Sequence, residues 1–180
     1  MGTVTPHPAA APAPPKLTAP ERLTPKHDLS AFDSGSQELD EWLRRQALRN
    51  EAKGGSRTYV VCHGDQVAGF YCLANGAVIH TDAPGKIKRN MPDPIPVMVL
   101  GRLAVARRFQ GHGLGRALVR DAFLRTAAAA EIAGIRAILV HAKDEQARLW
   151  YDRFGFFLPS PTDSLTLLAP LQEVAAALNP

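Results

Sequence analysis

The residues best suited to chemistry form a glycine-rich stretch, Gly111-His112-Gly113-Leu114-Gly115. The apolar residues 99–105 before it are typical of a strand, and the Ala- and Leu-rich residues from Arg116 to about Ala130 are typical of a helix. A glycine turn between a strand and a helix exposes backbone N–H groups and directs a helix N-terminus at one point, which attracts phosphate oxygens. The stretch therefore predicts either an anion-binding turn or a plain tight connection.

Two common phosphate motifs do not fit this stretch. No Lys-Ser or Lys-Thr pair follows the glycines, as a Walker A loop requires, and their spacing differs from the G-x-G-x-x-G pattern of dinucleotide-binding folds. The surrounding charge nevertheless favours an anion. The net charge is +4, and residues 86–125 hold nine Lys or Arg against two Asp. Such a local positive field suits an anionic ligand, a nucleic acid, or both.

The order of elements around the turn predicts a mixed sheet covered by helices. Apolar spacing predicts a helix over residues 37–51, and two segments rich in β-branched and aromatic residues, 57–62 and 66–74, predict a hairpin. Residues 97–105 form the central strand. Further expected elements are an edge strand within 23–32, a continuation of the hairpin at 77–80, a loop at 81–96, strands at 136–141, 156–158 and 165–168, and helices at 144–154 and 171–178. The expected fold class is α/β (α+β), with a mixed central sheet of about six or seven strands and helices on both faces.

Composition sets the domain limits and the expected surroundings. Residues 1–22 are rich in Pro and Ala and predict a disordered tail, while residues 23–180 predict a single domain. No apolar run approaches the roughly 20 residues that span a bilayer, and no signal peptide is present, so we expect a cytoplasmic protein without a membrane partner. Cys62 and Cys72 fall far apart in the expected hairpin and lack metal-ligand spacing, so we expect neither a disulfide nor a metal.

Once these elements are placed, the sequence resembles the GNAT acetyltransferases over residues 57–168. Gln110-Gly-His-Gly113-Leu-Gly115 is similar to the family's Q/R-x-x-G-x-G/A loop for acetyl-coenzyme A, and Leu103-Ala104-Val105 lies at the place of its splayed strand. Residues 147–156 are similar to the family's A-x-x-x-Y-x-x-x-G-F helix end, which contains Tyr151. These three features, in this order, are far more specific than any one alone. The resemblance implies the GNAT fold, with acetyl-CoA as co-substrate.

The resemblance also implies a role for each part of the site. Backbone groups of the splayed strand orient the acetyl and pantetheine arms, amides of the turn hold the pyrophosphate, and the phenol of Tyr151 protonates the leaving thiolate. Packing at a helix end remains the alternative for Tyr151. The implied cofactor-binding residues are Leu103, Ala104, Val105, Gln110, Gly111, His112, Gly113, Leu114, Gly115 and Arg116. An α-amine, with a pKa of about 7.7–8.0, is partly neutral at cell pH, so a base is not compulsory. The candidate bases are His112, His141 and Glu145, with a structural histidine as the alternative for His141.

A narrower resemblance links the chain to the GNAT toxins of toxin–antitoxin pairs, over about residues 27–168. It rests on residues 102–111, on the helix end at 151–156, on Pro159-Ser-Pro161, and on the segment from His27-Asp28 through Trp42-Leu43 to Thr58. Those toxins acetylate the α-amine of aminoacyl-tRNA and block translation. The resemblance implies a ribbon-helix-helix antitoxin and a homodimer. Basic residues suited to a tRNA backbone are Lys86, Lys88, Arg89, Arg107 and Arg108, with a solvated surface as the alternative.

Two other functions stay open from the sequence. One is a GNAT enzyme for a small amine or a protein N-terminus, which an acidic acceptor pocket would favour. The other is a non-catalytic binding module on a GNAT scaffold, for nucleic acid or an antitoxin. The leading interpretation is an acetyl-CoA-dependent toxin that acetylates aminoacyl-tRNA.

Overall fold

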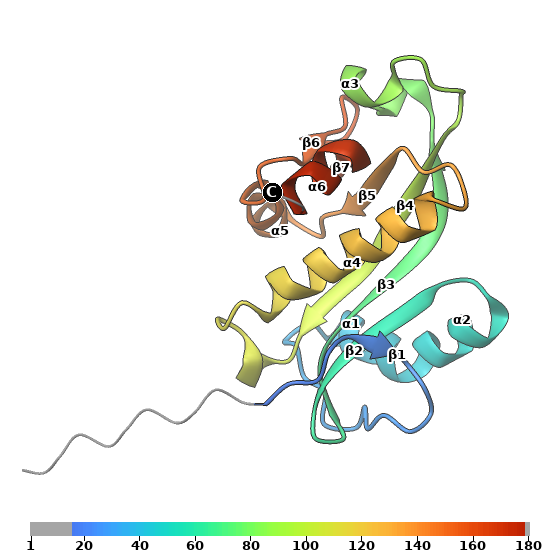
Figure 1. Ribbon diagram of the computed structural model, residues 1–180. Helices are drawn as coiled ribbons and strands as arrows, with labels where there is room; N and C mark the ends of the chain where they lie inside the picture. The colour runs from blue at the N-terminus through green and yellow to red at the C-terminus, as the bar shows by residue number, and fades with distance from the viewer. Residues whose placement is uncertain (1–15, 179–180) are drawn as a thin grey trace, which may run out of the picture.

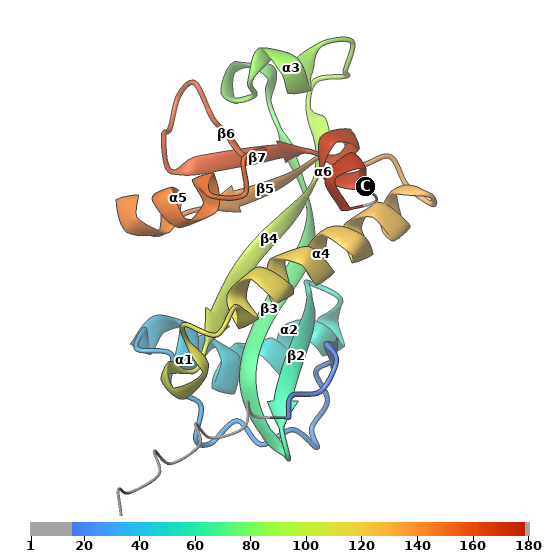
Figure 2. The ribbon, with the colours of Figure 1, turned by 60° about the vertical axis from the view of Figure 1, so that its left-hand side comes forward.

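The computed structural model describes residues 16–178, which form one seven-stranded sheet flanked by helices (Figures 1 and 2). The strand order is β1-β2-β3-β4-β5-β7-β6, and only β4 and β5 run parallel. The strands are β1 (Glu21–Arg22), β2 (Arg57–His63), β3 (Gln66–Val78), β4 (Ile95–Val105), β5 (Ala137–His141), β6 (Leu158–Pro159) and β7 (Thr166–Pro170). The predicted mixed sheet, the hairpin and the central strand are confirmed.

The helices lie on both faces of this sheet. They are α1 (Gln37–Trp42), which continues through a π-helical segment (Leu43–Ala47) into α2 (Leu48–Lys53), then α3 (Gly85–Lys88), α4 (Leu114–Ala130), α5 (Glu145–Asp152) and α6 (Leu171–Leu178). In β3, Phe70 stacks on Trp42 of α1 with ring centroids 6.0 Å apart. A side chain at the neighbouring Gly69 would instead meet Leu118 of α4. Because successive strand residues face opposite sides, α1 and α4 cover opposite faces, as Figure 2 shows. None of the described helices is long and apolar enough to cross a membrane.

The segment expected to be a loop over residues 81–96 contains regular structure. Residues 85–88 form the single turn of α3, and β4 already begins at Ile95. Ile87 and Ile95 are fully buried in a small apolar cluster at this end of the sheet. Burial of Ile87 explains why a segment rich in prolines still forms a helical turn. The expected continuation of β3 at 77–80 holds only to Val78, because His80 starts a 3-10 turn.

The predicted tail divides into two parts. Residues 1–15 lie outside the described residues, but residues 16–22 lie along the edge of β2, so the prediction of disorder is wrong for them. The Thr18 N–H donates to the Cys62 carbonyl at 2.9 Å, and β1 pairs Glu21 with Val60. The edge strand is therefore β1, and it precedes the expected window of 23–32. Cys62 and Cys72 form no disulfide, as predicted, and both are buried.

A polar group joins this N-terminal segment, the hairpin and α4. Asp121 of α4 accepts a hydrogen bond from the Tyr71 hydroxyl and another from Arg125 Nε at 2.8 Å. Arg125 also donates to the Pro20 carbonyl at 3.0 Å and lies over the ring of Tyr59. Burial and the Asp121 carboxylate both raise the pKa of Tyr71, so its hydroxyl stays protonated and remains a donor.

Removing the Asp121 carboxylate should therefore destabilise the fold. For Asp121→Ala we expect the free energy of unfolding to fall by roughly 1–3 kcal/mol, because the buried Tyr71 hydroxyl and Arg125 lose a common acceptor. Denaturant unfolding measures the loss. Asp152→Ala is the matched control, because Asp152 pairs with Arg148 on the surface and such pairs contribute about 0–1 kcal/mol. Equal losses in the two variants would contradict a special role for Asp121.

Candidate functional site

Strands β4 and β5 separate halfway along β4. They pair only where Val97–Leu100 lies beside Ala137–Val140, and beyond this point β4 continues with β3 alone. Gly101 is an extra residue in the β3–β4 register, because Leu100 pairs with Leu73 and Arg102 already pairs with Cys72. A bulge bends a strand and increases its local twist. The bulge therefore lies where β4 turns away from β5.

The separation leaves backbone groups of β4 without a strand partner. The Ala106 N–H donates to the Ala68 carbonyl at 2.8 Å, which makes this a hydrogen-bonded pair of the antiparallel β3–β4 ladder. Hydrogen-bonded and non-bonded pairs alternate along such a ladder. The backbone groups of Leu103 and Val105 thus point away from β3, into the gap beside β5. The Val105 carbonyl accepts from Gln110 Nε2 at 2.8 Å, whereas the Val105 N–H and both backbone groups of Leu103 have no partner among the described residues.

The glycine turn lies directly after this stretch of β4. Gly111 and Gly113 have φ of +78° and +82°, in the left-handed region that favours glycine. No atom of residues 16–178 lies within 4 Å of the position that a Cβ would take at either residue. The N-terminal amides of α4 receive no side-chain cap from Gly113 and open onto this space. Gln110 anchors the turn, since its Nε2 also donates to the Ser34 carbonyl at 2.9 Å. The geometry suits an anion at the start of a helix.

The third glycine of the turn serves packing. A Cβ on Gly115 would lie 3.2 Å from the indole ring of Trp150. Glycine therefore lets the first turn of α4 approach α5 closely. Arg116 follows and places its guanidinium over the ring of Phe154, 5.3 Å from the centroid. Leu114 is buried against the sheet, and His112 is exposed, with Nδ1 2.8 Å from the Gln110 carbonyl.

Tyr151 lies on α5, which the Asp144 side chain caps by accepting from the Ala147 N–H at 2.8 Å. Its ring packs against Trp150 and Phe157, with centroids 4.9 and 5.2 Å away, and the residue is 8 % exposed. Burial raises the pKa of the phenol. Tyr151 is therefore held protonated at any physiological pH, as a proton donor must be.

The five basic residues singled out from the sequence fall into two separate groups. Lys86, Lys88 and Arg89 belong to α3 and its end, next to the start of β4, whereas Arg107 and Arg108 follow its far end (Figure 1). Lys86 forms an ion pair with Glu173 of α6. At the other end, Arg107 pairs with Asp33, and Arg108 donates to Gln66 Oε1 at 2.6 Å. A single surface patch of all five is excluded.

The three candidate bases differ in their hydrogen-bond partners and in their surroundings. Both carboxylate oxygens of Glu145 share the single Nε–H of Arg148, each at 2.9 Å, and this contact lowers the pKa of Glu145. The carboxylate is thus occupied and a weak proton acceptor. His112 belongs to the turn itself. His141 is exposed at the end of β5, with Nδ1 2.9 Å from Thr166 Oγ1. His141 faces a hollow of about 400 Å³, whose lining includes Ala77, Ile79, Asp82, Ser160 and Thr166. His112 lines a smaller hollow, of about 270 Å³, beside residues 17–20 and the start of α4.

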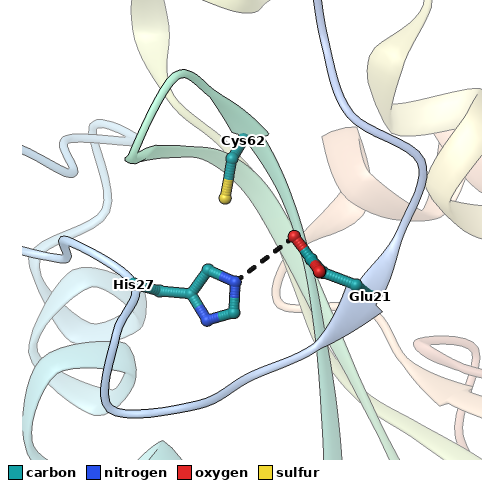
Figure 3. A group of neighbouring side chains, drawn as sticks. All are labelled: Glu21, His27 and Cys62. Carbon is teal, nitrogen blue, oxygen red and sulfur yellow. Dashed lines mark ion pairs between the residues drawn. The ribbon is translucent and has the colours of Figure 1, made fainter.

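A second group of titratable side chains, Glu21, His27 and Cys62, ties β1 to the hairpin (Figure 3). Their ligand atoms all lie within 4.8 Å of one another, a spacing that raises the question of a metal. The Thr24 N–H donates to His27 Nδ1 at 3.0 Å, which leaves the ring proton on Nε2. His27 Nε2, which carries that proton, lies 3.4 Å from Glu21 Oε1 and offers no lone pair to a cation. We interpret this group as structural, because it holds β1 and the following loop against the hairpin.

Several residues of the site were not identified from the sequence. Ser34, Thr166 and Asp163 approach it through contacts between segments that lie far apart in the chain. Arg102 is another: its guanidinium lies 4.7 Å from the ring centroid of Trp42, and its buried Nε lacks a hydrogen-bond partner among the described residues. A polar residue following a glycine inside an apolar strand was the one available signal for Arg102.

Comparisons with known proteins agree with this geometry. The family model described as an acetyltransferase (GNAT) domain matches residues 54–157. A protein of Mycobacterium tuberculosis (strain ATCC 25618 / H37Rv) named tRNA-acetylating toxin is 49 % identical over 162 residues, which cover 90 % of this chain and 97 % of the relative.

Two solved structures are also similar. AtaT complexed with acetyl-methionyl-tRNAfMet has a TM-score of 0.83 and 30 % identity, covering 91 % of this chain and 100 % of that one. A tyrosine-to-phenylalanine mutant of AtaT, bound to acetyl-CoA and to the C-terminus of the antitoxin AtaR, has a TM-score of 0.77 and 28 % identity. It covers 91 % of this chain and 99 % of that one.

Proposed function

The chain belongs to the GNAT acetyltransferase family, and from this premise we propose that it is a toxin that acetylates the α-amino group of aminoacyl-tRNA and so blocks translation. The observation that carries the proposal is its 49 % identity, over nearly the full length of both chains, to a tRNA-acetylating toxin. The site adds physical support, because a gap in the sheet ends at a turn suited to an anion and at a buried phenol.

We assign the binding of acetyl-CoA to this gap and turn. The free backbone groups of Leu103 and the Val105 N–H suit the amides of a pantetheine arm, which pairs like a short strand. The open amides between Gly111 and Gly115 suit the pyrophosphate. Ala104 lies between the two strand residues, and Gln110 keeps strand and turn in register. The co-substrate supplies an acetyl thioester.

The residues of the chain then supply orientation and protons. As the amine nitrogen bonds to the acetyl carbon, the carbon–sulfur bond breaks and leaves a thiolate. The Tyr151 phenol, held protonated by burial, donates its proton to that sulfur. The co-substrate reacts without a covalent enzyme intermediate in this scheme. No step calls for a metal.

Partners and surroundings follow from the same proposal. A tRNA backbone needs cationic contacts, for which Arg107 and Arg108, beside the turn, are best placed. We further propose that the chain forms a homodimer, that a ribbon-helix-helix antitoxin binds it, and that it acts in the cytoplasm. The structure of AtaT with the C-terminus of AtaR supports an antitoxin partner.

A small-amine acetyltransferase is the second candidate function. The hollow beside His141 is lined by two carboxylates, Asp82 and Asp163, and by no lysine or arginine among the described residues. An acidic hollow binds an ammonium group whether or not the amine is attached to tRNA. Full-length similarity to a tRNA-acetylating toxin favours the tRNA function over this one.

One experiment separates these functions. Purified protein is incubated with labelled acetyl-CoA and a pool of charged tRNA, and in parallel with free amino acids and polyamines. We expect label on aminoacyl-tRNA alone. Label only on small amines would replace the proposal with the second candidate. Binding of acetyl-CoA with no transfer to any acceptor would favour a non-catalytic binding module.

Replacing Arg107 and Arg108 together with Ala should weaken tRNA use. We expect KM for aminoacyl-tRNA to rise about tenfold and the slope of log(kcat/KM) against log salt to flatten by one to two units, because each phosphate contact contributes about 0.9 to that slope. The matched control removes two other exposed cations, Lys26 and Lys53. Kinetics that change equally in both double variants would exclude a specific tRNA contact at Arg107 and Arg108.

A further inference from the structure

We propose that His141 is the proton acceptor for the attacking amine, and that the hollow beside it receives the ammonium form of that amine. The inference rests on the proposed acetyl transfer and assigns a residue that the comparisons leave unassigned. It is carried by a chain of hydrogen bonds behind His141, by the position of the residue at the end of β5, and by the charge of the hollow.

The hydrogen bonds fix which nitrogen of His141 is free. Thr166 Oγ1 donates its only proton to Asp163 Oδ2 at 2.7 Å. The same oxygen lies 2.9 Å from His141 Nδ1, so it must accept the proton of that nitrogen. The lone pair of the neutral ring is therefore on Nε2. A histidine oriented by a hydroxyl and a carboxylate is the arrangement that proton transfer requires.

His141 occupies the point where the reacting groups must meet. It follows Val140, the last residue of β5 that pairs with β4, and so lies at the apex of the gap assigned to acetyl-CoA. Val140 and Tyr151 belong to the apolar core on the α4 side of the sheet. His141 follows Val140 in the strand and therefore faces the opposite side. A proton donor for the thiolate and a proton acceptor for the amine then approach the acetyl group from opposite faces.

The negative charge of the hollow explains why a proton acceptor is needed there. The titratable groups that face it are Asp163 on the β6–β7 loop and Asp82, whose Oδ1 accepts from Thr162 at 2.7 Å. Two carboxylates favour the ammonium form of a bound amine and raise its pKa above the free value. The ammonium has no lone pair for attack. A base inside the hollow is therefore useful even for a weakly basic aminoacyl ester.

The ammonium gives one proton to His141 Nε2, and His141 later releases it to solvent. The neutral amine forms the N–C bond to the acetyl carbon while the C–S bond breaks. The thiolate takes the proton of Tyr151, and the second proton lost by nitrogen restores the phenol. The sum converts an ammonium and acetyl-CoA into an acetamide, coenzyme A and one proton.

The test compares pH profiles of kcat for the full chain and for His141→Gln, with aminoacyl-tRNA as acceptor. We expect His141→Gln to lower kcat about 100-fold at pH 7 and by less than about fivefold at pH 9, where the amine loses its proton unaided. Thr166→Val should show the same trend with a smaller loss, because the imidazole loses its orientation. Imidazole added to His141→Ala should restore part of the rate at pH 7.

The matched control is His63→Gln, another exposed histidine at a strand end, which should keep wild-type kinetics. Binding of acetyl-CoA and melting temperature should stay unchanged in His141→Gln. If His141→Gln lowers kcat by the same factor at every pH, or does not lower it, the assignment of His141 is overturned. If wild type acetylates only small amines, the tRNA proposal fails and the same profiles with that amine still test His141. Absence of transfer to any acceptor would overturn both.

Discussion

Replacing Tyr151 with Phe should lower kcat by about 100- to 1,000-fold while the Kd for acetyl-CoA stays within twofold. General acid catalysis by a positioned side chain raises a reaction rate by about 10²- to 10⁴-fold, and this substitution removes only the hydroxyl group that donates the proton. The aromatic contacts with Trp150 and Phe157 do not need the hydroxyl, so the fold is kept. Single-turnover transfer of labelled acetyl measures the loss, and calorimetric titration measures the Kd.

The pH dependence of the wild type gives a second measure of the same role. Because burial raises the pKa of Tyr151, its acid form persists through the alkaline range, and we expect no alkaline fall of kcat below about pH 10. Tyr59→Phe is the matched control, since Tyr59 lies on the hairpin, stacked on Tyr71 and away from α5. Full activity in Tyr151→Phe would leave Tyr151 a packing residue.

Local motifs made the centre of the site predictable. The glycine turn, the strand before it and the α5 end each depend on residues close together in the sequence, and their conformations follow from glycine and from helix capping. Two positive-φ glycines fall in the predicted turn, and the Asp144 side chain caps α5 at the start of the helix predicted over residues 144–154. The functional meaning of the motifs came from the family resemblance.

The remaining features depend on contacts that no local pattern contains. Residues 16–22 read as tail because they lack apolar periodicity, yet the backbone of Thr18 bonds to Cys62, 44 residues away. The hydrogen bond that orients His141 is made with Thr166, which lies 25 residues further along the sequence. The basic residues near α3 and those after β4 also lie apart in space, because the 11-residue strand β4 extends between them. Register and strand direction, set by the whole sheet, decide such positions.

The turn offers the other large effect. For Gly113→Val we expect the Kd for acetyl-CoA to rise about 10- to 100-fold, as it would if one or two hydrogen bonds to a charged phosphate were lost, at about 1.5–3 kcal/mol each. The side chain would project into space that is now open at the N-terminus of α4, and valine tolerates φ of +82° poorly. Calorimetric titration of acetyl-CoA measures the change.

A weaker affinity for acetyl-CoA in Gly113→Val has two possible causes: loss of contacts to the phosphate, or backbone strain that destabilises the fold. The variant Gly54→Val separates them. Gly54 ends α2 with φ of +72°, and no atom of the described part of the chain lies within 4 Å of its Cβ position, but it lies outside the gap and the turn. Both variants should lose comparable stability, about 1–2 kcal/mol, from a left-handed β-branched residue. Only Gly113→Val should lose affinity for acetyl-CoA. An unchanged Kd in Gly113→Val would remove the turn from the binding site, whereas matching losses of affinity would assign the effect to strain.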